Sequence, residues 1–148
     1  MANVDQIKQL REETNVSISE CKKALEEARG DIKIAKEILQ KRGIEFAKKK
    51  TGREAKEGII ETYVHSGKKV GVMIELNCET DFVARSEAFQ KLAHEICLQV
   101  AALNPEEFPI FEQPWIKDET RNVRDLINEC ITKLGENVVL SKFIRYEL

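Results

Sequence analysis

Apolar residues fall at every second position along residues 70–76, and this period is typical of a half-buried β-strand. Residues 59–65 precede this segment and also favour a strand. The connecting residues 66–69 contain the glycine that a short hairpin needs. A third alternating segment covers residues 138–146, close to the end of the chain. The pattern therefore predicts three strands, of which the first two form a hairpin.

The turn after the second strand leads into a segment with helical periodicity, which predicts a helix over residues 82–103. Thr80 is suited to cap that helix, and Asp81 suits the positive end of its dipole. Phe82 follows at once, so a carboxylate and an aromatic ring lie side by side at a strand-to-helix corner. Periodicity alone favours a buried role for the ring, because it begins a stripe at heptad spacing. The stripe consists of Phe82, Phe89, Ile96 and Leu103.

The first part of the chain has the periodicity of three short helices. The first is expected over residues 4–13. The second begins after Ser17, which fits a capping box with Glu20. The third is expected over residues 32–42, with Gly43 as its C-terminal cap. The first helix places Val4, Ile7, Leu10 and Arg11 on one side. The apolar positions of the third helix that are expected to face inward are Ile34, Ala35, Ile38 and Leu39.

Three prolines follow the 82–103 segment and indicate irregular backbone. A last helix is predicted to begin at Asp118 or Thr120 and to end at about Leu134, where Gly135 closes it. The order in the second part is strand, strand, helix, helix, strand. This order predicts an α+β core, in which a small three-stranded antiparallel sheet is packed by helices on one face.

The chain of 148 residues carries 24 basic and 26 acidic side chains, a net charge of -2 that argues against a general nucleic-acid binder. Residues 41–56 depart from this balance, with seven basic residues against two acidic ones and a local charge of +5. The favoured interpretation is a solvated linker that begins with a helical segment. The alternative is a ribosome- or RNA-associated adaptor that acts through this basic stretch.

The remaining composition gives little support to catalysis. The four cysteines form no C-x-x-C pair and sit in apolar patterns, so we expect reduced thiols packed as small hydrophobes. His94 and Cys97 are three residues apart, but a full metal ligand set is hard to assemble around them. No serine or cysteine has an obvious activating histidine. We expect no enzyme activity, no metal site and no cofactor.

The corner itself lacks glycine, so it does not fit a phosphate-binding loop, and we expect no direct nucleotide binding. No apolar run is long enough to span a bilayer, and the N-terminus has no secretory-type apolar core. The expectation is a soluble cytoplasmic protein that uses no membrane.

Two segments and the end of the chain resemble the signatures of a known family. The first reads Leu10-Arg11-x-x-Thr14-x-x-x-Ile18-x-x-Cys21-Lys22-Lys23-Ala24-Leu25. The second is residues 75–85, which read ELNCETDFVAR, and the ending is residues 134–147. Two motifs in the right order with a matching end are a specific combination. The chain resembles bacterial translation elongation factor Ts along nearly its whole length, as a short form with a single core module.

The resemblance implies a UBA-like (ubiquitin-associated-like) three-helix domain over residues 1–53, with the basic linker at its end. Residues 54–148 would be the elongation factor Ts core, or dimerisation-type, domain. The implied function is guanine nucleotide exchange on elongation factor Tu during translation elongation, without covalent chemistry and without need for nucleic acid. Short members of the family resemble those that form a homodimer. An apolar strand face within residues 138–144 is a candidate interface, although its residues are also typical of an ordinary core.

The resemblance also assigns candidate contact residues. Asp81 and Phe82 would enter the G domain of elongation factor Tu, where the ring would wedge into an apolar pocket. Thr80 and Val83 complete the segment that would displace the Mg²⁺ ion holding GDP. Ile18 would contact the same partner from the N-terminal domain. Its loop departs from the family, which often has glycines and a second methionine where this chain has Asn15, Ser17 and Ser19. A binding module that uses only the first three helices is a further alternative.

Overall fold

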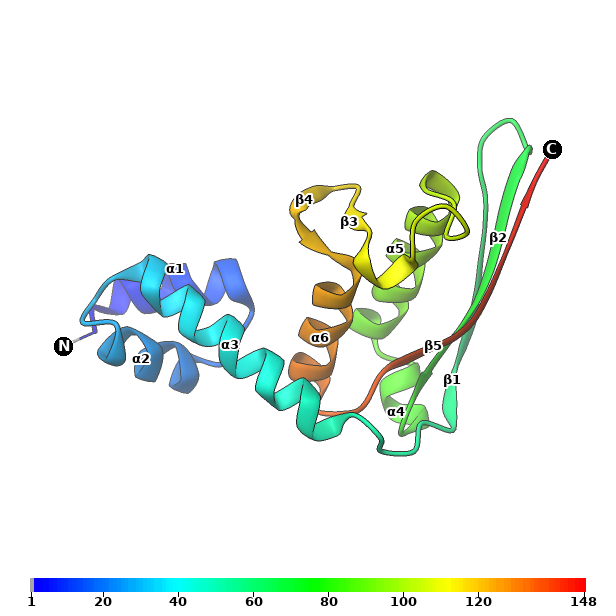
Figure 1. Cartoon of the computed structure of the whole chain (residues 1–148). Helices are drawn as coiled ribbons and strands as arrows, with labels where there is room; N and C mark the ends of the chain where they lie inside the picture. The colour runs from blue at the N-terminus through cyan, green and yellow to red at the C-terminus, as the bar shows by residue number, and fades with distance from the viewer. Residues whose placement is uncertain (1) are drawn as a thin grey trace. The chain divides into compact units, whose positions relative to one another are not determined.

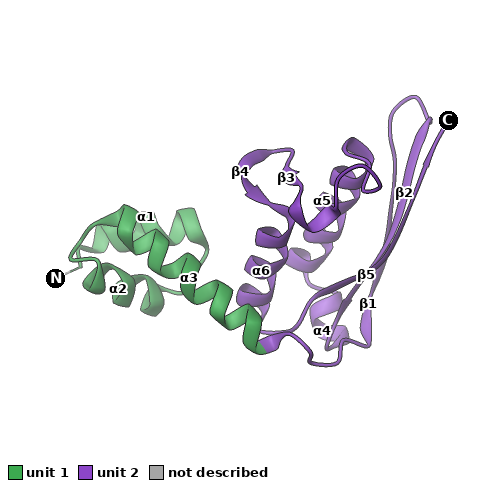
Figure 2. Ribbon diagram, viewed as in Figure 1, with its two compact units in different colours: residues 1–49 green, residues 50–148 purple. Residues whose placement is uncertain are grey.

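The computed structural model describes residues 2–148 and separates two compact units, Met1–Lys49 and Lys50–Leu148 (Figure 2). The first unit holds three helices, α1 (Val4–Thr14), α2 (Ile18–Glu27) and α3 (Ile32–Lys50, whose last residue falls in the second unit). Their facing apolar side chains make a small core of Leu10, Cys21, Ala24, Leu25, Ala28, Ala35 and Leu39. The three predicted helices are therefore present.

Several details of the first unit differ from the prediction. Helix α3 does not end at Gly43 but continues to Lys50, so most of the predicted basic linker is helical. A single glycine costs a helix only about 1 kcal/mol, and good helix formers surround this one. Ile34 is exposed rather than inward-facing. Ser17 accepts a hydrogen bond from the Glu20 amide, whereas the Glu20 carboxylate contacts Lys23 and Arg42 instead of closing a capping box.

The second unit is built on a three-stranded antiparallel sheet in the order β1-β2-β5. Its strands are β1 (Glu57–Val64), β2 (Val70–Cys78) and β5 (Val139–Glu147). The helices α4 (Asp81–Ala84), α5 (Glu87–Ala102) and α6 (Val123–Leu134) lie on one side of this sheet (Figure 1). A mixed helix-and-strand fold with a small antiparallel sheet is thus confirmed. Assignment of the first unit to the UBA-like class, and the domain limits at residues 53 and 54, stay predictions.

The predicted helix over residues 82–103 is in fact two helices. The chain turns at Arg85, and Ser86 then adopts an extended backbone with φ -68° and ψ 147°. The Ser86 hydroxyl accepts a hydrogen bond from the Phe89 amide at 3.3 Å and so begins α5 as a new helix. Phe89 and Ile96 are fully buried, but the break removes Phe82 from their stripe. The interpretation of Phe82 as the first core residue of that stripe is therefore wrong.

The segment between α5 and α6 also has more structure than predicted. It contains a 3₁₀ turn η1 (Ile110–Glu112) and a two-stranded ribbon of β3 (Pro114–Trp115) and β4 (Asp118–Asn122). The last helix therefore begins at Val123 rather than at Asp118 or Thr120. The Asp118 carboxylate accepts hydrogen bonds from the amide and hydroxyl of Thr120, and such local bonds compete with helix initiation. Asn122 and Asp125 supply a full capping box four residues later.

The core of the second unit lies between the inner face of the sheet and the helices α5 and α6. Its largest fully buried apolar side chains are Ile74, Leu76, Phe89, Ile96, Val100 and Val123. The four cysteines are free and buried, which confirms their predicted role as small hydrophobes. Within residues 2–148, none of the helices combines the length and apolar character needed to cross a membrane.

Candidate functional site: the corner after strand β2

The corner between β2 and α5 is a single helical turn, α4, anchored on one side and exposed on the other. Val83 and Ala84 are buried, with 5% and 2% of their surfaces exposed. Phe82 exposes 81% of its surface, the second-largest exposed fraction among the large hydrophobic residues described. Because its neighbours fix the backbone, the ring is presented to solvent from a defined position.

Thr80 begins α4 as the prediction required. Its backbone is extended, with φ -126° and ψ 151°, and its hydroxyl oxygen accepts a hydrogen bond from the Val83 amide at 3.3 Å. The hydroxyl proton is donated to the Glu136 carboxylate at 2.7 Å. The cap is therefore held from both sides, by the helix that it starts and by a residue far along the chain.

A network of five residues, Arg53, Glu79, Thr80, Glu136 and Asn137, surrounds the start of the corner, and we call it the clasp. Glu136 Oε1 accepts from the backbone amides of Glu79 and Thr80 at 3.1 and 2.9 Å. In return, the Glu79 carboxylate accepts from the Asn137 amide at 2.6 Å and pairs with the Arg53 guanidinium at 2.7 Å. The Asn137 side chain donates to the Arg53 carbonyl at 2.8 Å. The clasp joins the end of β2 to the start of β5.

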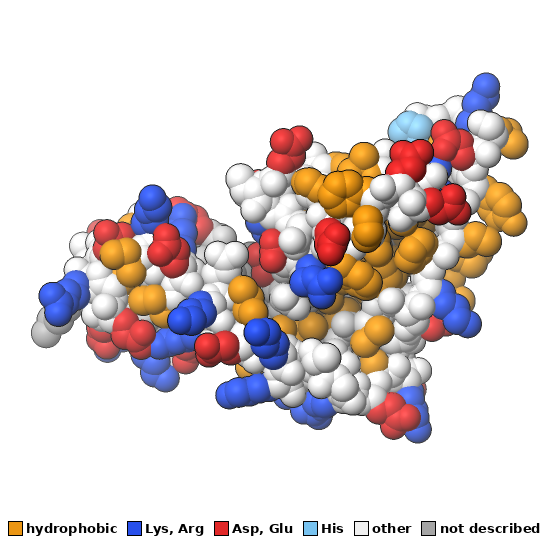
Figure 3. Space-filling view, viewed as in Figure 1, with side chains coloured by type: hydrophobic (Ala, Val, Ile, Leu, Met, Phe, Trp, Pro, Cys, Tyr) orange, Lys and Arg blue, Asp and Glu red, His pale blue; other side chains and the backbone are white. Residues whose placement is uncertain are grey.

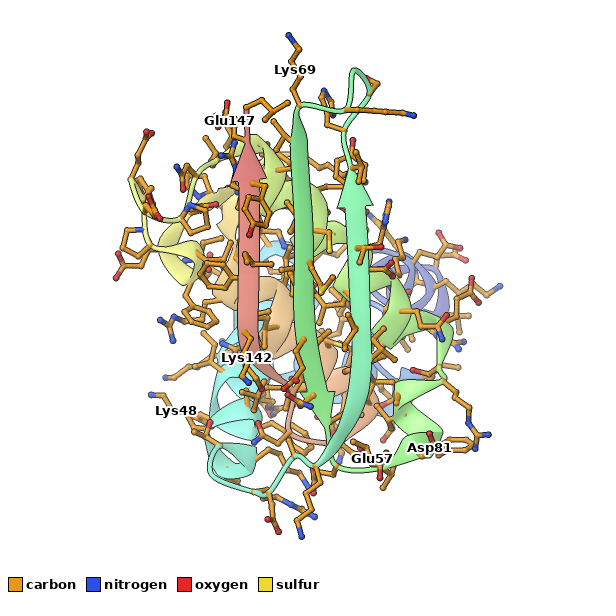
Figure 4. All side chains as sticks on the ribbon, turned by 90° about the vertical axis from the view of Figure 1, so that its right-hand side faces the viewer. Lys48, Glu57, Lys69, Asp81, Lys142 and Glu147 are labelled. Atoms are coloured by element: carbon orange, nitrogen blue, oxygen red, sulfur yellow. The ribbon has the colours of Figure 1, made fainter. Side chains whose placement is uncertain are left out.

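Asp81, next to the exposed ring, is itself exposed. Its carboxylate pairs with the Arg85 guanidinium at 3.1 Å, one helical turn further on. Both side chains are largely in solvent, so this pair contributes at most about 1 kcal/mol to stability and can open readily. Figure 4 shows Asp81 at the same end of the sheet as Glu57. The corner therefore offers an acid and an aromatic ring together at one end of the unit.

Cys78 lies beneath the corner and is shielded from solvent. Its thiol donates to the Thr80 carbonyl at 3.2 Å. Burial, helped by the nearby Glu136 carboxylate, raises the pKa of the Cys78 thiol to about 11. A thiol with so high a pKa stays protonated near neutral pH, so Cys78 is a packing residue with a weak hydrogen bond.

The arrangement fits recognition better than catalysis or metal binding. The amides of Glu79 and Thr80 are already bonded to Glu136, so they are not available to cradle a phosphate. In the described part of the chain, no group of three or more histidine, cysteine, aspartate or glutamate side chains is placed to hold a metal ion. An exposed ring on a fixed backbone, with an acid beside it, is suited to insertion into another molecule.

The other predicted contact residue, Ile18, belongs to the first unit. It is the first residue of α2 and exposes 54% of its surface, so it is available to a partner. Asn15, in the same loop, adopts a left-handed backbone with φ 56° and ends α1. The structure thus brings residues 80–83 together in one corner and places Ile18 on the separate first unit.

The basic stretch over residues 41–56 is less uniform than its composition suggests. Arg42 pairs with two acids of α2, Glu20 and Glu27, which offsets part of its charge. Over the first unit, the face seen in Figure 3 mixes basic and acidic side chains. This arrangement gives no strong support to a surface for polyanions.

Sequence reasoning missed the clasp. Glu136 and Asn137 were part of the resembling end of the chain, but no role was assigned to them. They lie 56 to 84 positions away from the residues that they bind, so no local periodicity or cap pattern connects these segments.

Comparison with known proteins places the corner and the clasp in a family context. The family model described as "Elongation factor TS" matches residues 79–148. Proteins named "Elongation factor Ts" from Thermotoga sp. (strain RQ2) and from Thermotoga maritima are each 42% identical over 190 aligned positions. Each alignment covers 99% of this chain and 96% of the relative. The protein of that name from Thermoanaerobacter sp. (strain X514) is 37% identical over 193 positions, covering 99% and 95%.

These alignments also show that this chain is a shorter version of its relatives. The alignment has 190 positions and this chain has 148 residues, so at least 42 positions (190 minus 148) of the alignment are gaps in this chain. The corner and the clasp are nevertheless present.

Proposed function

The chain belongs to the elongation factor Ts family, and from this membership and the exposed corner we propose that it is a guanine nucleotide exchange factor for elongation factor Tu. The observation that carries this proposal is the position of Phe82, which is exposed on a turn that is anchored by the buried Val83 and Ala84 and capped by Thr80. A partner that covers this exposed aromatic ring gains free energy from burying it. Burying such a side chain contributes about 1.5–3 kcal/mol.

In the proposed mechanism, Phe82 enters an apolar pocket of the G domain and carries Asp81 and its neighbours with it. The entering segment disturbs the Mg²⁺ ion that bridges the phosphates of bound GDP. Because that ion neutralises phosphate charge, its displacement weakens nucleotide binding and GDP leaves. Coupling between two ligands is reciprocal, so incoming nucleotide weakens the hold on the exchange factor and releases it.

Ile18 provides a second proposed contact, from the first unit to the same partner. It is exposed at the start of α2, beside a loop whose residues depart from the family's glycine-containing form. Contact through Ile18 would supply affinity, whereas the corner would supply the effect on nucleotide. This division predicts that the two sites affect different quantities in an exchange assay.

The proposed activity involves no covalent step, no cofactor and no nucleotide bound by this chain, and it takes place in the cytoplasm without a nucleic acid. The occupied amides of Glu79 and Thr80 support this part, since both already donate to the Glu136 carboxylate. The RNA-adaptor alternative stays a prediction without a specific observation in its favour.

We further propose that the protein acts as a homodimer in which two copies meet at the open face of the sheet. No helix of residues 50–148 covers this face, which is turned toward the viewer in Figure 4. Strand pairing places Thr62, Met73 and Ile144 in one row across it, and Gly71 and Tyr146 in the next. The exposed apolar side chains on this face are Ile60, Val64, Met73, Ile144 and Tyr146.

This proposed interface overlaps the candidate stretch within residues 138–144 only at Lys142 and Ile144. Val138 and Leu140 are buried in the core, as the alternative interpretation of that stretch required. Glu75 lies opposite Lys142 in the strand register, so each copy presents an acid and a base side by side. Two copies related by a twofold axis could pair these charges around an apolar centre.

Release of fluorescent GDP from elongation factor Tu tests the exchange proposal directly. We expect the protein to accelerate release strongly at substoichiometric to equimolar amounts. A folded protein that leaves the release rate unchanged, at concentrations well above that of elongation factor Tu, would overturn the proposal.

A further inference from the structure

We infer that Glu136 is a positioning residue for nucleotide exchange, because it fixes the corner that presents Phe82. This inference rests on the proposed function. It adds a residue that lies outside the predicted contact segment 80–83. Glu136 itself would not contact the nucleotide or its metal ion; it would act through Thr80.

Helix α4 cannot hold its own geometry. It has four residues, and one hydrogen-bonded turn is unstable in water because nucleation fixes several backbone angles for a single bond. Its orientation therefore depends on what surrounds it. Burial of Val83 and Ala84 anchors its far side, and the Thr80 cap anchors its start.

The Glu136 carboxylate is the principal partner of that cap. It accepts three hydrogen bonds at 3.1, 2.9 and 2.7 Å, from the Glu79 amide, the Thr80 amide and the Thr80 hydroxyl. Two consecutive amides and a hydroxyl aimed at one carboxylate determine both the direction of the backbone and the rotamer of Thr80. Hydrogen bonds to a charged acceptor are about twice as strong as neutral ones.

The carboxylate also sets which way the Thr80 hydroxyl points. A hydroxyl has a single proton, and donating it to Glu136 leaves a lone pair for the Val83 amide. A glutamine at position 136 would present an NH₂ group to one of its partners. If its oxygen kept the two amides, its NH₂ would face the Thr80 hydroxyl as a donor, and the hydroxyl proton would lose its carboxylate acceptor. The isosteric change thus disturbs the cap without removing volume.

The clasp holds Glu136 in place from the opposite side. The Asn137 amide donates to the Glu79 carboxylate at 2.6 Å. Each of the two segments therefore supplies a carboxylate that accepts backbone hydrogen bonds from the other. The Glu79 carboxylate also pairs with the Arg53 guanidinium, and the Arg53 carbonyl accepts a hydrogen bond from the Asn137 side chain. The start of the corner is therefore fixed to the segment that enters β5.

The test uses the full-length protein with Glu136→Gln and Glu136→Ala. Glu119→Gln, in the exposed strand β4, is the matched control because it removes the same charge from a surface site. A first measurement, on the free protein, is amide hydrogen exchange. We expect the amides of Thr80 and Val83 to exchange about tenfold faster in both Glu136 variants, with the Ile74 amide in β2 unchanged.

The second measurement is GDP release from elongation factor Tu over a range of factor concentrations. We expect the maximal release rate to fall about tenfold in Glu136→Gln, while the concentration for half-maximal effect changes by less than about threefold. A residue that only stabilised the fold would not separate the two quantities. Combining Glu136→Gln with Thr80→Val should slow release no more than the stronger single change, because both act on one cap.

The outcomes separate this inference from the proposed function. If Phe82→Ala slows release but Glu136→Gln exchanges GDP at the wild-type rate, the inference is overturned and the proposed function stands. Unchanged exchange of the Thr80 and Val83 amides in the glutamine variant would overturn it independently of any partner. If the wild-type protein does not accelerate release at all, the proposed function itself has failed.

Discussion

Phe82 and Val83 are neighbours on a four-residue helix, yet Phe82 exposes 81% of its surface and Val83 only 5%. Their side chains leave the backbone in directions that separate two tasks. Val83 holds the corner to the unit, and Phe82 faces outward. The structure therefore allows function and stability to be altered by substitutions at adjacent positions.

Phe82→Ala should slow GDP release by about tenfold or more while leaving the fold intact. Anchor residues of this kind commonly contribute 2 kcal/mol or more to binding, whereas an exposed substitution changes stability by only about 0.5 kcal/mol. Two quantities are measured: the release rate of fluorescent GDP, and the guanidinium chloride concentration at which half of the free variant is unfolded. Phe108→Ala is the matched control, since Phe108 is also an exposed phenylalanine but lies outside the corner. Equal rates for the two variants would contradict the assignment of Phe82.

Val83→Ala, unlike Phe82→Ala, should lower the free energy of unfolding. Removing two buried methyl groups from a packed site costs about 1–3 kcal/mol. Chemical denaturation of the free protein measures this loss. A stability loss of less than about 0.5 kcal/mol would show that Val83 does not anchor the corner.

The strands could be predicted because each is determined by its own residues. The alternation along β2 leaves Val72, Ile74 and Leu76 buried, and the hairpin loop before it has positive φ at Gly67 and Lys68. In contrast, the break at Ser86 could not be predicted from periodicity. A serine is tolerated within a helix, and the heptad spacing of the apolar residues passes across it without interruption.

The clasp could not be predicted for a different reason. Glu136 and Thr80 meet only because the sheet brings the end of β2 beside the start of β5. A charged residue after a helix-ending glycine is an ordinary feature of surface loops. Its role depends on the tertiary partners, which a single sequence does not display. The candidate corner was thus identified from its residues, but its support was not.

Gly58→Ala should destabilise the second unit more than any other glycine-to-alanine change in the described chain. Gly58 has φ +155°, and an added Cβ would lie 2.2 Å from the Leu76 carbonyl oxygen and 2.8 Å from the Asn77 Cα, both backbone atoms of the paired strand. We expect a loss of about 2–5 kcal/mol from strain and overlap together. Gly67→Ala is the control, because its φ is also positive but its Cβ would meet nothing within 4 Å. Similar urea midpoints for the two variants would contradict this prediction.

The buried thiols should react slowly in the native protein. Burial raises the pKa of Cys78 to about 11 and the pKa values of Cys97 and Cys130 to about 12. At pH 8 only about one Cys78 thiol in a thousand is ionised, and the thiolate is the reactive form. Ellman's reagent should therefore label the native protein far more slowly than the guanidinium-unfolded one. Rapid labelling of Cys78 at pH 8 without unfolding would contradict the burial of this thiol beneath the corner.

The same thiols predict a loss of stability at alkaline pH. Their folded pKa values lie above the unfolded value near 9, so the folded state retains protons that the unfolded state has lost. Their contribution is fully present below about pH 9 and is lost as the pH rises toward 12. In Cys130→Ala one of these thiols is absent, so the fall in unfolding free energy between pH 8 and 10.5 should be smaller. An equal fall in both proteins would contradict this assignment.

Charge placed on the open sheet face should prevent self-association without unfolding the protein. Met73 and Ile144 lie opposite each other in the strand register and are about half exposed, so Met73→Glu and Ile144→Glu each put a carboxylate near the centre of the proposed interface. In a twofold dimer each substitution introduces two like charges into one desolvated patch, which costs several kcal/mol. Sedimentation should show a dimer for the wild type and a monomer for both variants. Ile116→Glu, an exposed isoleucine between β3 and β4, serves as the control and should remain dimeric. A wild-type protein that stays monomeric up to high micromolar concentration would exclude this interface. If so, GDP release would have to depend on a single copy of the corner.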